Sequence, residues 1–358
     1  MSSVPSTYDT TRLMDGVVSL GSHAFPREPL GADTVVIEPT YMGICRADIK
    51  EIIGSRDVME DRGPLFGHEL VGTVFFAGAD TGFEEGDPVT LNPNITPNRT
   101  TGFAEYVFVR GTKEELDEAV VRLPESEAGI GEGVWMPEPF ACIVHALRKL
   151  LELTRQTSLA GKRVGIVGAG CAGLMFAMYA RHLGASVVVF NRGEERRVFA
   201  REQGILAEGE IAALAEAGER RDAFDVVVVA PTVATAELLD VAAGLAADGA
   251  VLLVYGGTRE GDRFPGGEVD VDAVRRSERI ESVRHRGKRL DIAGAYGCGR
   301  EDYEEGFRLH ALHPERFPLE RLASRRLDLA ELPAFVMDAA AGVLDLPGKV
   351  LVRAGSRG

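Results

Sequence analysis

The most restrictive feature of this chain is a glycine-rich turn at residues 168–173 (GAGCAG). Residues 162–167 (KRVGIV) before it are mostly apolar and β-branched, and residues 174–180 (LMFAMYA) after it favour a helix. A strand that enters a glycine turn and continues as a helix is the first half of a nucleotide-binding βαβ unit. The turn therefore predicts a dinucleotide site, although a tight turn without a ligand is the alternative.

Each glycine of this turn has an expected role. Gly168 permits the tight turn, Gly170 lets the backbone approach a pyrophosphate, and Gly173 lets the helix pack closely on the strand. Cys171 and Ala172 open the helix, whose unpaired N–H groups and positive dipole end favour phosphate binding.

The end of the next predicted strand, residues 186–190 (SVVVF), bears on the choice between NAD and NADP. An acid there would bind the adenosine ribose and repel an added phosphate. This chain has Asn191 and Arg192 instead, with Arg196 after them. Because an amide does not repel a 2′-phosphate and a guanidinium binds one, the sequence favours NADP. Two alternatives stay open: the arginines are solvated surface charge, or Glu194 reaches the ribose.

Length and charge exclude several classes of protein. A chain of 358 residues suits two domains better than one, and its formal net charge of −15 argues against a nucleic-acid or anionic-membrane partner. The first seven residues lack the pattern of a signal peptide, and no apolar run reaches bilayer length. The four cysteines, at positions 45, 142, 171 and 298, do not resemble a disulfide framework. These features predict a cytoplasmic protein.

The hydrophobic pattern predicts an α/β protein made of two different parts. Short alternating segments at 34–37, 70–76, 88–91 and 103–109 predict a β-rich or barrel-like body. From about residue 140, strands expected at 164–167, 187–190, 225–229, 250–255 and 290–293 alternate with helical stretches such as 233–247. This alternation predicts a doubly wound parallel sheet. A charged helix is expected near Glu301, and a last strand at 348–353.

Four dispersed residues form a plausible cage for one metal ion: Cys45, His68, Glu69 and Glu138. Zinc accepts thiolate, imidazole and carboxylate ligands together in a tetrahedral shell. Taken singly, Cys45 is more often a buried inert cysteine, and His68 is equally well a structural histidine. Glu138 lies between two prolines, which is a costly way to hold a surface carboxylate.

The chain resembles the zinc-dependent medium-chain dehydrogenase/reductase superfamily. The matching segments, in the family's order and spacing, are residues 43–48 (GICRAD), 67–69 (GHE), 86–89 (GDPV), 102–106 (GFAEY), 138–141 (EPFA), 168–173 and 348–350 (GKV). The resemblance implies a GroES-like catalytic domain at 1–147, completed by 299–358, and a Rossmann cofactor domain at 148–298. It also implies an active site between them and a homodimer or homotetramer.

The paired acids make the chain look most like the polyol, sugar and amino-alcohol dehydrogenases of that superfamily. The resemblance implies that Cys45, His68 and Glu69 are the first metal ligands, with Glu138 as a fourth or exchangeable one. Asp48 would then steady the metal site from the second layer.

Two departures from the family pattern matter. Many members bind a second, structural zinc through four cysteines in a segment that corresponds to 92–100 here, and this segment contains no cysteine. One zinc ion per subunit is therefore expected. The second departure is Ala47, where members usually place a serine or threonine that relays the alcohol proton.

The sequence thus predicts a zinc-dependent oxidoreductase that moves a hydride between a secondary alcohol and NADP(H). Zinc would polarise the alcohol, and the nicotinamide would take its hydride. Residues 294–297 (GAYG) are either a border of the nicotinamide site or a buried turn. Other interpretations are a zinc-free quinone or enone reductase of the same superfamily, a nucleotide sensor, and a non-catalytic relative. The absence of a hydroxyl at position 47 favours the last.

Overall fold

The computed structural model describes residues 5–26, 30–54, 66–95, 98–99, 102–124, 136–344 and 346–355. The expectations for the first four residues and for positions 96, 97 and 100 lie outside these ranges. The chain divides into two compact units: unit 1 is Met1–Glu138, Gly299–Phe307 and Ala323–Gly358, and unit 2 is Pro139–Cys298 and Arg308–Leu322. The boundary expected at residue 147 lies inside a helix that joins the two units.

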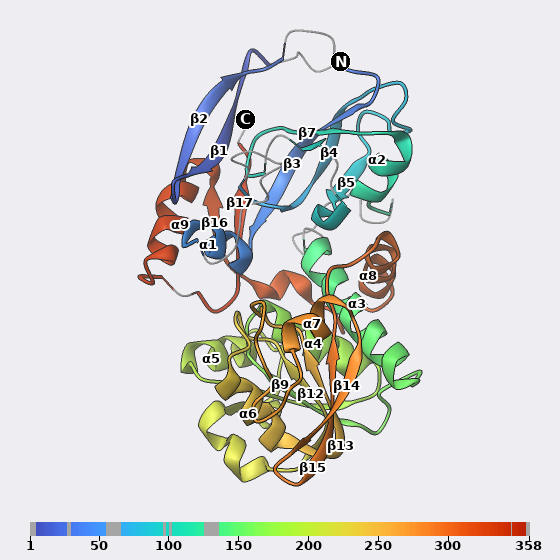
Figure 1. Ribbon diagram of the computed structural model, residues 1–358. Helices are drawn as coiled ribbons and strands as arrows, with labels where there is room; N and C mark the ends of the chain where they lie inside the picture. Colours follow the sequence, from blue (N-terminus) through green and yellow to red (C-terminus); the bar gives the residue numbers. More distant parts are fainter. Residues whose placement is uncertain are drawn as a thin grey trace. The chain divides into compact units, whose positions relative to one another are not determined.

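Unit 1 is built on a mostly antiparallel sheet, in which only β16 and β17 pair in parallel among the described strands (Figure 1). Its strands are β1 (Thr7–Met14), β2 (Val17–Ala24), β3 (Thr34–Ile44), β4 (Glu69–Ala77), β5 (Pro88–Leu91), β6 (Asn98–Arg99), β7 (Val107–Arg110), β8 (Val120–Arg122), β16 (Ala323–Asp328) and β17 (Lys349–Arg353). Its helices are α1 (Arg46–Ile52), α2 (Lys113–Ala119) and α9 (Leu332–Ala340). Within the described ranges the sheet order is β16-β17-β3-β4-β5-β8, β7 pairs with β3, and β1 and β2 form a separate hairpin.

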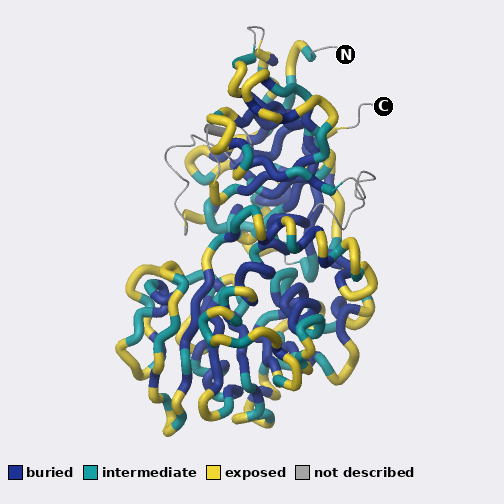
Figure 2. The backbone as a smooth tube through the Cα atoms, turned by 90° about the vertical axis from the view of Figure 1, so that its right-hand side faces the viewer, coloured by how far each residue is buried: buried dark blue, intermediate teal, exposed yellow. Residues whose placement is uncertain are grey.

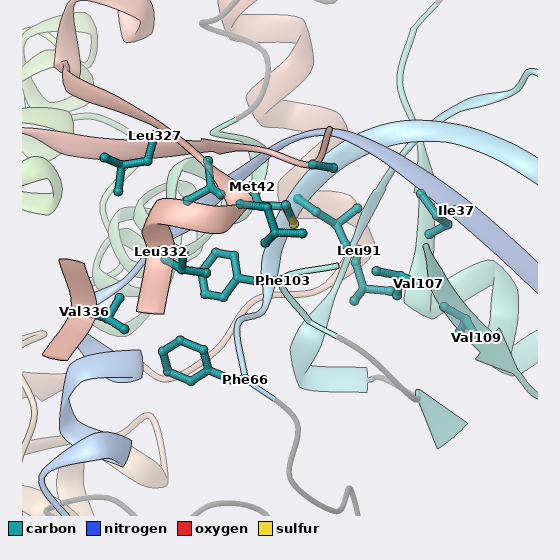
Figure 3. Packing of buried hydrophobic residues seen from close by; sticks show 14 of the residues in the cluster. Ile37, Met42, Phe66, Leu91, Phe103, Val107, Val109, Leu327, Leu332 and Val336 are labelled. Atoms are coloured by element: carbon teal, nitrogen blue, oxygen red, sulfur yellow. The ribbon is translucent and has the colours of Figure 1, made fainter. Parts of the chain in front are cut away.

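The largest apolar cluster of unit 1 joins its sheet to α9, and a smaller aromatic cluster around Val36 and Tyr106 is separate from it. Ile37 and Met42 of β3, Leu91 of β5, and Leu332 and Val336 of α9 are fully buried in the larger cluster. Figure 3 shows these side chains together with the rings of Phe66 and Phe103, which belong to the same cluster. Burial of such a continuous apolar cluster is the main stabilising term for a unit of this size.

One predicted strand is shorter than expected. The pattern at 103–109 predicted a single strand, but β7 begins only at Val107. Before it, the Phe103 N–H donates to the Phe66 carbonyl, and the Phe103 carbonyl accepts from the Thr11 N–H. These bonds join residue 103 to Phe66 and to strand β1, whose Thr10 forms an isolated antiparallel bridge with Ala104. The fully buried Phe103 also packs against the Phe66 ring, with 5.4 Å between ring centroids.

Unit 2 contains a mostly parallel seven-stranded sheet within the described ranges, in the order β11-β10-β9-β12-β13-β15-β14. The strands are β9 (Arg163–Val167), β10 (Ser186–Asn191), β11 (Ile211–Ala213), β12 (Phe224–Val229), β13 (Ala246–Val254), β14 (Ile280–His285) and β15 (Lys288–Gly294). The helices are α3 (Pro137–Thr154), α4 (Cys171–His182), α5 (Glu194–Glu202), α6 (Ala236–Leu245), α7 (Val271–Arg276) and α8 (Arg300–Leu312), of which α3 and α8 cross the unit boundary.

The predicted α/β fold is confirmed, with one addition. The edge strand β14 runs antiparallel to β15, whereas the alternating pattern predicted parallel strands alone. Buried residues concentrate in the strands of each unit, and exposed ones in the loops and outer helices (Figure 2). The described ranges also contain short 3₁₀ helices: η2 (Pro93–Ile95), η4 (Glu208–Glu210), η5 (Leu214–Arg220), η6 (Leu319–Leu322) and η7 (Leu329–Glu331). None of the described helices is long and apolar enough to cross a membrane.

The glycine turn joins β9 to α4, at the carboxyl end of the strand. Gly168 has φ of +109°, a conformation that side chains strongly disfavour, and its N–H donates to the Phe190 carbonyl at 2.8 Å. A Cβ on Gly173 would stand 1.8 Å from the Gly168 carbonyl oxygen. Helix α4 therefore packs so closely on the turn that no side chain fits at position 173.

This packing generates a prediction about paired glycine substitutions. Gly173→Ala must push α4 away from the turn, so we expect a marked fall in the free energy of unfolding. Gly244→Ala, inside α6, is the matched control, because a Cβ there meets nothing within 4 Å. A helix-interior alanine then stabilises by about 0.5–1 kcal/mol relative to glycine. Thermal unfolding checks both variants, and equal shifts would contradict the packing argument.

Candidate metal and cofactor sites

The candidate metal site lies where three strand ends of unit 1 meet. Strand β3 pairs antiparallel with β4 on one side, with Gly43 opposite Glu69, and with β17 on the other, with Ile44 opposite Val350. The end of β3 therefore lies beside the beginnings of both neighbours. Cys45 follows the last residue of β3, and Lys349 begins β17.

Gly67, in the left-handed conformation, bends the chain so that the His68 and Glu69 side chains both lie near this point. Gly67 has φ of +92°, and a Cβ on it would stand 2.4 Å from the Phe103 ring, so only glycine fits there. The bend brings one ligand atom each of Cys45, His68 and Glu69 within 4.8 Å of one another. The structure thus brings three of the four predicted ligands together.

Asp48 fixes both the backbone and the imidazole of this group. It is fully buried at the start of α1, and its Oδ2 accepts the Cys45 N–H at 2.8 Å. Its Oδ1 lies 2.9 Å from the His68 Nδ1. A histidine whose Nδ1–H donates to a carboxylate presents Nε2 to a metal, so Asp48 orients the ring in the way a metal site needs.

The same contact controls the charge of His68. Burial disfavours the imidazolium, but the adjacent Asp48 carboxylate and the Cys45 sulfur outweigh it and hold the pKa of His68 well above its usual value. An incoming cation must therefore displace a proton from this ring, as is general for metal sites built on histidine and cysteine.

Glu69 has a buried partner that was not predicted from the sequence. Lys349 Nζ lies 2.5 Å from each Glu69 carboxylate oxygen, and both side chains are buried, with 7% and 1% of their surfaces exposed. The available signal was a lysine that directly precedes the apolar run Val350-Leu351-Val352, because a lysine buried in a strand needs an acid nearby.

Glu138 stands apart from this group among the described residues. It lies in the first turn of α3 and is 8% exposed, but it is outside the set of ligand atoms within 4.8 Å. The four-residue cage is therefore present as three grouped donors plus one buried acid.

The three grouped donors fit zinc. A thiolate, an imidazole and a carboxylate are all ligands that zinc accepts, and three protein ligands leave an open position as catalytic sites require. The ion pair of Glu69 does not remove it from this set, because an ionised carboxylate has about four lone-pair sites and Lys349 uses only some of them.

The cofactor candidates surround the glycine turn of unit 2. The Asn191 Oδ1 accepts the Ala169 N–H at 3.0 Å, and its Nδ2 donates to the Gly193 carbonyl, so this side chain braces the turn. Arg196 Nη1 would lie 3.1 Å from a Cβ on Gly170, so its guanidinium lies over the turn. Arg192 is exposed just beyond β10.

Tyr296 follows β15 at the same edge of the sheet. It is 43% exposed, and the guanidinium groups of Arg275 and Arg276 lie 4.9 and 5.5 Å from its ring centroid. Residues 294–297 are therefore not a wholly buried turn.

The buried ion pair of unit 1 generates a second prediction. Lys349→Met leaves a buried carboxylate without its cation, which costs about 3–5 kcal/mol, so we expect the free energy of unfolding to fall by about that amount. Adding Glu69→Gln should recover much of the loss, since no uncompensated charge remains. Lys113→Met, at the start of α2, is the surface control. Urea unfolding of metal-free protein measures all three, and a double variant no more stable than Lys349→Met would contradict this account.

Sequence comparisons match parts of this chain to known proteins. The alcohol dehydrogenase GroES-like domain family matches residues 31–141. An L-threonine 3-dehydrogenase of Anaeromyxobacter sp. (strain K) is 27% identical over 237 residues, which span 57% of this chain and 64% of that enzyme. The chain thus spans less than two thirds of the length of this relative.

Solved structures match the fold along nearly the whole chain. A Sinorhizobium meliloti 1021 protein bound to NADP has a TM-score of 0.72 and 22% identity, covering 98% of this chain and 100% of that one. The 2R,3R-butanediol dehydrogenase of Bacillus subtilis has a TM-score of 0.68 and 18% identity, covering 97% and 100%. Residues 31–141 thus match the alcohol dehydrogenase GroES-like domain family, and the chain as a whole has the fold of these solved structures, with a Rossmann-type sheet and a grouped cysteine, histidine and glutamate.

Proposed function

We propose that this protein is a zinc-dependent oxidoreductase that transfers a hydride between a secondary alcohol of a polyol, sugar or cyclitol and NADP(H). The observation that carries the proposal is the group of thiol, imidazole and carboxylate ligand atoms within 4.8 Å of one another, in a chain that also has a dinucleotide-binding turn. A zinc-free reductase of the same fold would have no use for this donor set.

Cys45, His68 and Glu69 would hold one zinc ion, with Glu138 as a fourth or exchangeable ligand. When bound, zinc supplies Lewis-acid chemistry that polarises an alcohol or carbonyl oxygen. Asp48 would keep the His68 ring in a ligating orientation, and Lys349 holds the Glu69 carboxylate in place through a buried ion pair. This pairing would make Glu69 a weaker donor to zinc.

The proposal that the cofactor is NADP rests on the residues at the end of β10 and directly after it. The Asn191 carbonyl oxygen is engaged by the turn, and the amide carries no charge that would repel a 2′-phosphate. Arg192 and Arg196 supply planar donors that bind phosphate well. A neighbour of the same fold is bound to NADP, which is consistent with this choice.

The substrate proposal rests on Ala47, which lies in α1 directly after Arg46. A methyl group cannot relay a proton, so the alcohol proton must leave through water or through a second hydroxyl on the substrate. Polyols and cyclitols supply that hydroxyl. Butanediol and threonine, in the names of two relatives, likewise carry a second polar group beside the alcohol. A homodimer or homotetramer in the cytoplasm also stays part of the proposal.

A non-catalytic relative is the second candidate, and Ala47 is the observation that favours it. Such a protein would bind the cofactor without turning over any alcohol, so an activity screen with metal analysis separates the two candidates.

The metal assignment predicts about one zinc per subunit. His68→Ala should remove most zinc and most activity while unit 1 stays folded, because the imidazole is one of only three grouped donors. His23→Ala, in β2, is the matched control and should leave both unchanged. Elemental analysis and circular dichroism provide the readouts. Two zinc ions per subunit, or full activity after metal removal, would contradict the assignment of one catalytic zinc.

The cofactor assignment predicts a selective loss of NADP affinity. A charge-assisted hydrogen bond contributes about 1.5–3 kcal/mol, so Arg192→Ala should weaken NADP binding by roughly tenfold to a hundredfold and leave NAD binding nearly unchanged. Arg201→Ala, in the helix α5 that follows Arg192, is the control. Titration of both cofactors checks this, and a wild-type preference for NAD would count against the assignment.

The substrate assignment predicts a difference between butane-2,3-diol and butan-2-ol. Positioned proton transfer contributes about 10²–10⁴-fold, so the diol should react clearly faster. Ala47→Ser should accelerate the mono-alcohol more than the diol, because only the mono-alcohol lacks a relay. Steady-state kcat/KM values for both substrates give the answer. Equal rates that the serine does not change would remove the support for a polyol.

A further inference from the structure

One face of α3 carries a row of chemically active side chains. Cys142, His145 and Lys149 are spaced by three and four residues, so they project from the same side of the helix. His145 Nε2 lies 2.6 Å from Glu278 Oε1, and Lys149 Nζ lies 3.8 Å from the other oxygen of the same carboxylate. This row meets a second segment of unit 2 that is far away in the sequence.

The second segment is the loop 295–299, which follows β15 and contains Cys298. Glu278 Oε1 accepts the Tyr296 N–H at 2.9 Å, so the carboxylate that pairs with α3 also holds the start of the loop. Two residues later the loop presents Cys298, which is 7% exposed. Glu278 thus links the face of α3 to the loop, and Cys142 of this face and Cys298 of the loop also meet.

The two sulfur atoms are close and are not bonded. Cys142 Sγ lies 3.7 Å from Cys298 Sγ, although 156 residues separate them. None of the four cysteines is in a disulfide bond. A disulfide bond is about 2.0 Å long, so the sulfurs must approach by roughly 1.7 Å.

The backbone around Cys298 permits this approach. Gly297, with φ of +76°, and Gly299 flank it, and residues 295–299 belong to no helix or strand. The loop can therefore move without breaking a sheet ladder. Cys142 is partly exposed, which gives a small oxidant access to one sulfur of the pair.

We propose that Cys142 and Cys298 form a redox modification site that switches between a dithiol and a disulfide. With a peroxide as oxidant, the Cys142 thiolate attacks a peroxide oxygen, the O–O bond breaks, and a sulfenic acid and one water form. The Cys298 thiolate then attacks the sulfenic sulfur, the S–S bond forms, and a second water leaves. In total, two thiols lose two electrons and two protons, and hydrogen peroxide becomes two waters. An external dithiol reverses the step by exchange.

The position of the pair indicates what a disulfide would constrain. Strands β9, β12, β13 and β15 are parallel, so the loop after β15 lies at the same sheet edge as the glycine turn after β9. The bond would tie this edge to α3. The proposal does not depend on the reaction or the cofactor that the protein uses.

The test uses the full-length protein treated with hydrogen peroxide under native conditions, then denatured and alkylated with N-ethylmaleimide. We expect intact mass to show two alkylated cysteines of the four present, a peptide map to show a 142–298 cross-link, and dithiothreitol to restore all four. Cys171→Ser is the matched control and should still form the cross-link.

Two variants make the result decisive. Cys142→Ser and Cys298→Ser should abolish the cross-link, and in Cys298→Ser a dimedone adduct should accumulate at Cys142, because its sulfenic acid has no partner. Four free thiols at a peroxide level that leaves the circular dichroism unchanged would overturn the proposal. So would a wild-type cross-link from Cys142 to a different cysteine, or oxidation of Cys142 to sulfinic acid without a cross-link.

Discussion

The buried contact between Glu69 and Lys349 is the constraint on which the candidate metal site depends. It joins the first residue of β4 to the first residue of β17, which are 280 positions apart, across the end of β3. Two charges this deeply buried are stable only as a pair, because each would be very costly alone. The pair therefore holds the three strand ends in register around the point where Cys45 and His68 present their side chains.

This arrangement also separates the tasks of the acids in unit 1. The Asp48 carboxylate accepts the Cys45 N–H and contacts the His68 imidazole, so this acid fixes the positions of two of the grouped donors. Glu69 faces the grouped donors on one side and a lysine on the other. The first acid gives the site its shape, and the second adjusts how strongly the site attracts a cation.

Much of this was predictable from the sequence, because local patterns carry it. The glycine turn and the strand alternation follow from short segments of the chain. Cys45, His68 and Glu69 are dispersed, and their grouping was expected from their ligand chemistry and from the resemblance to a known family. Lys349 was not predictable as the partner of Glu69, since that contact depends on the pairing register of β17 with β3. The approach of Cys142 to Cys298 depends in the same way on how α3 packs, which no local pattern encodes. The antiparallel β14 was not predicted because its sequence, IESVRH, is mostly polar and lacks the apolar run that marks a buried parallel strand.

The central claim is that one zinc ion is held by a mixed set of ligands with a single sulfur. Zinc K-edge X-ray absorption of the purified protein measures this directly. The account predicts one sulfur at about 2.3 Å and two to three nitrogen or oxygen neighbours at about 2.0–2.2 Å. Two or more sulfur neighbours per zinc, or a spectrum that Cys45→Ala leaves unchanged, would contradict it.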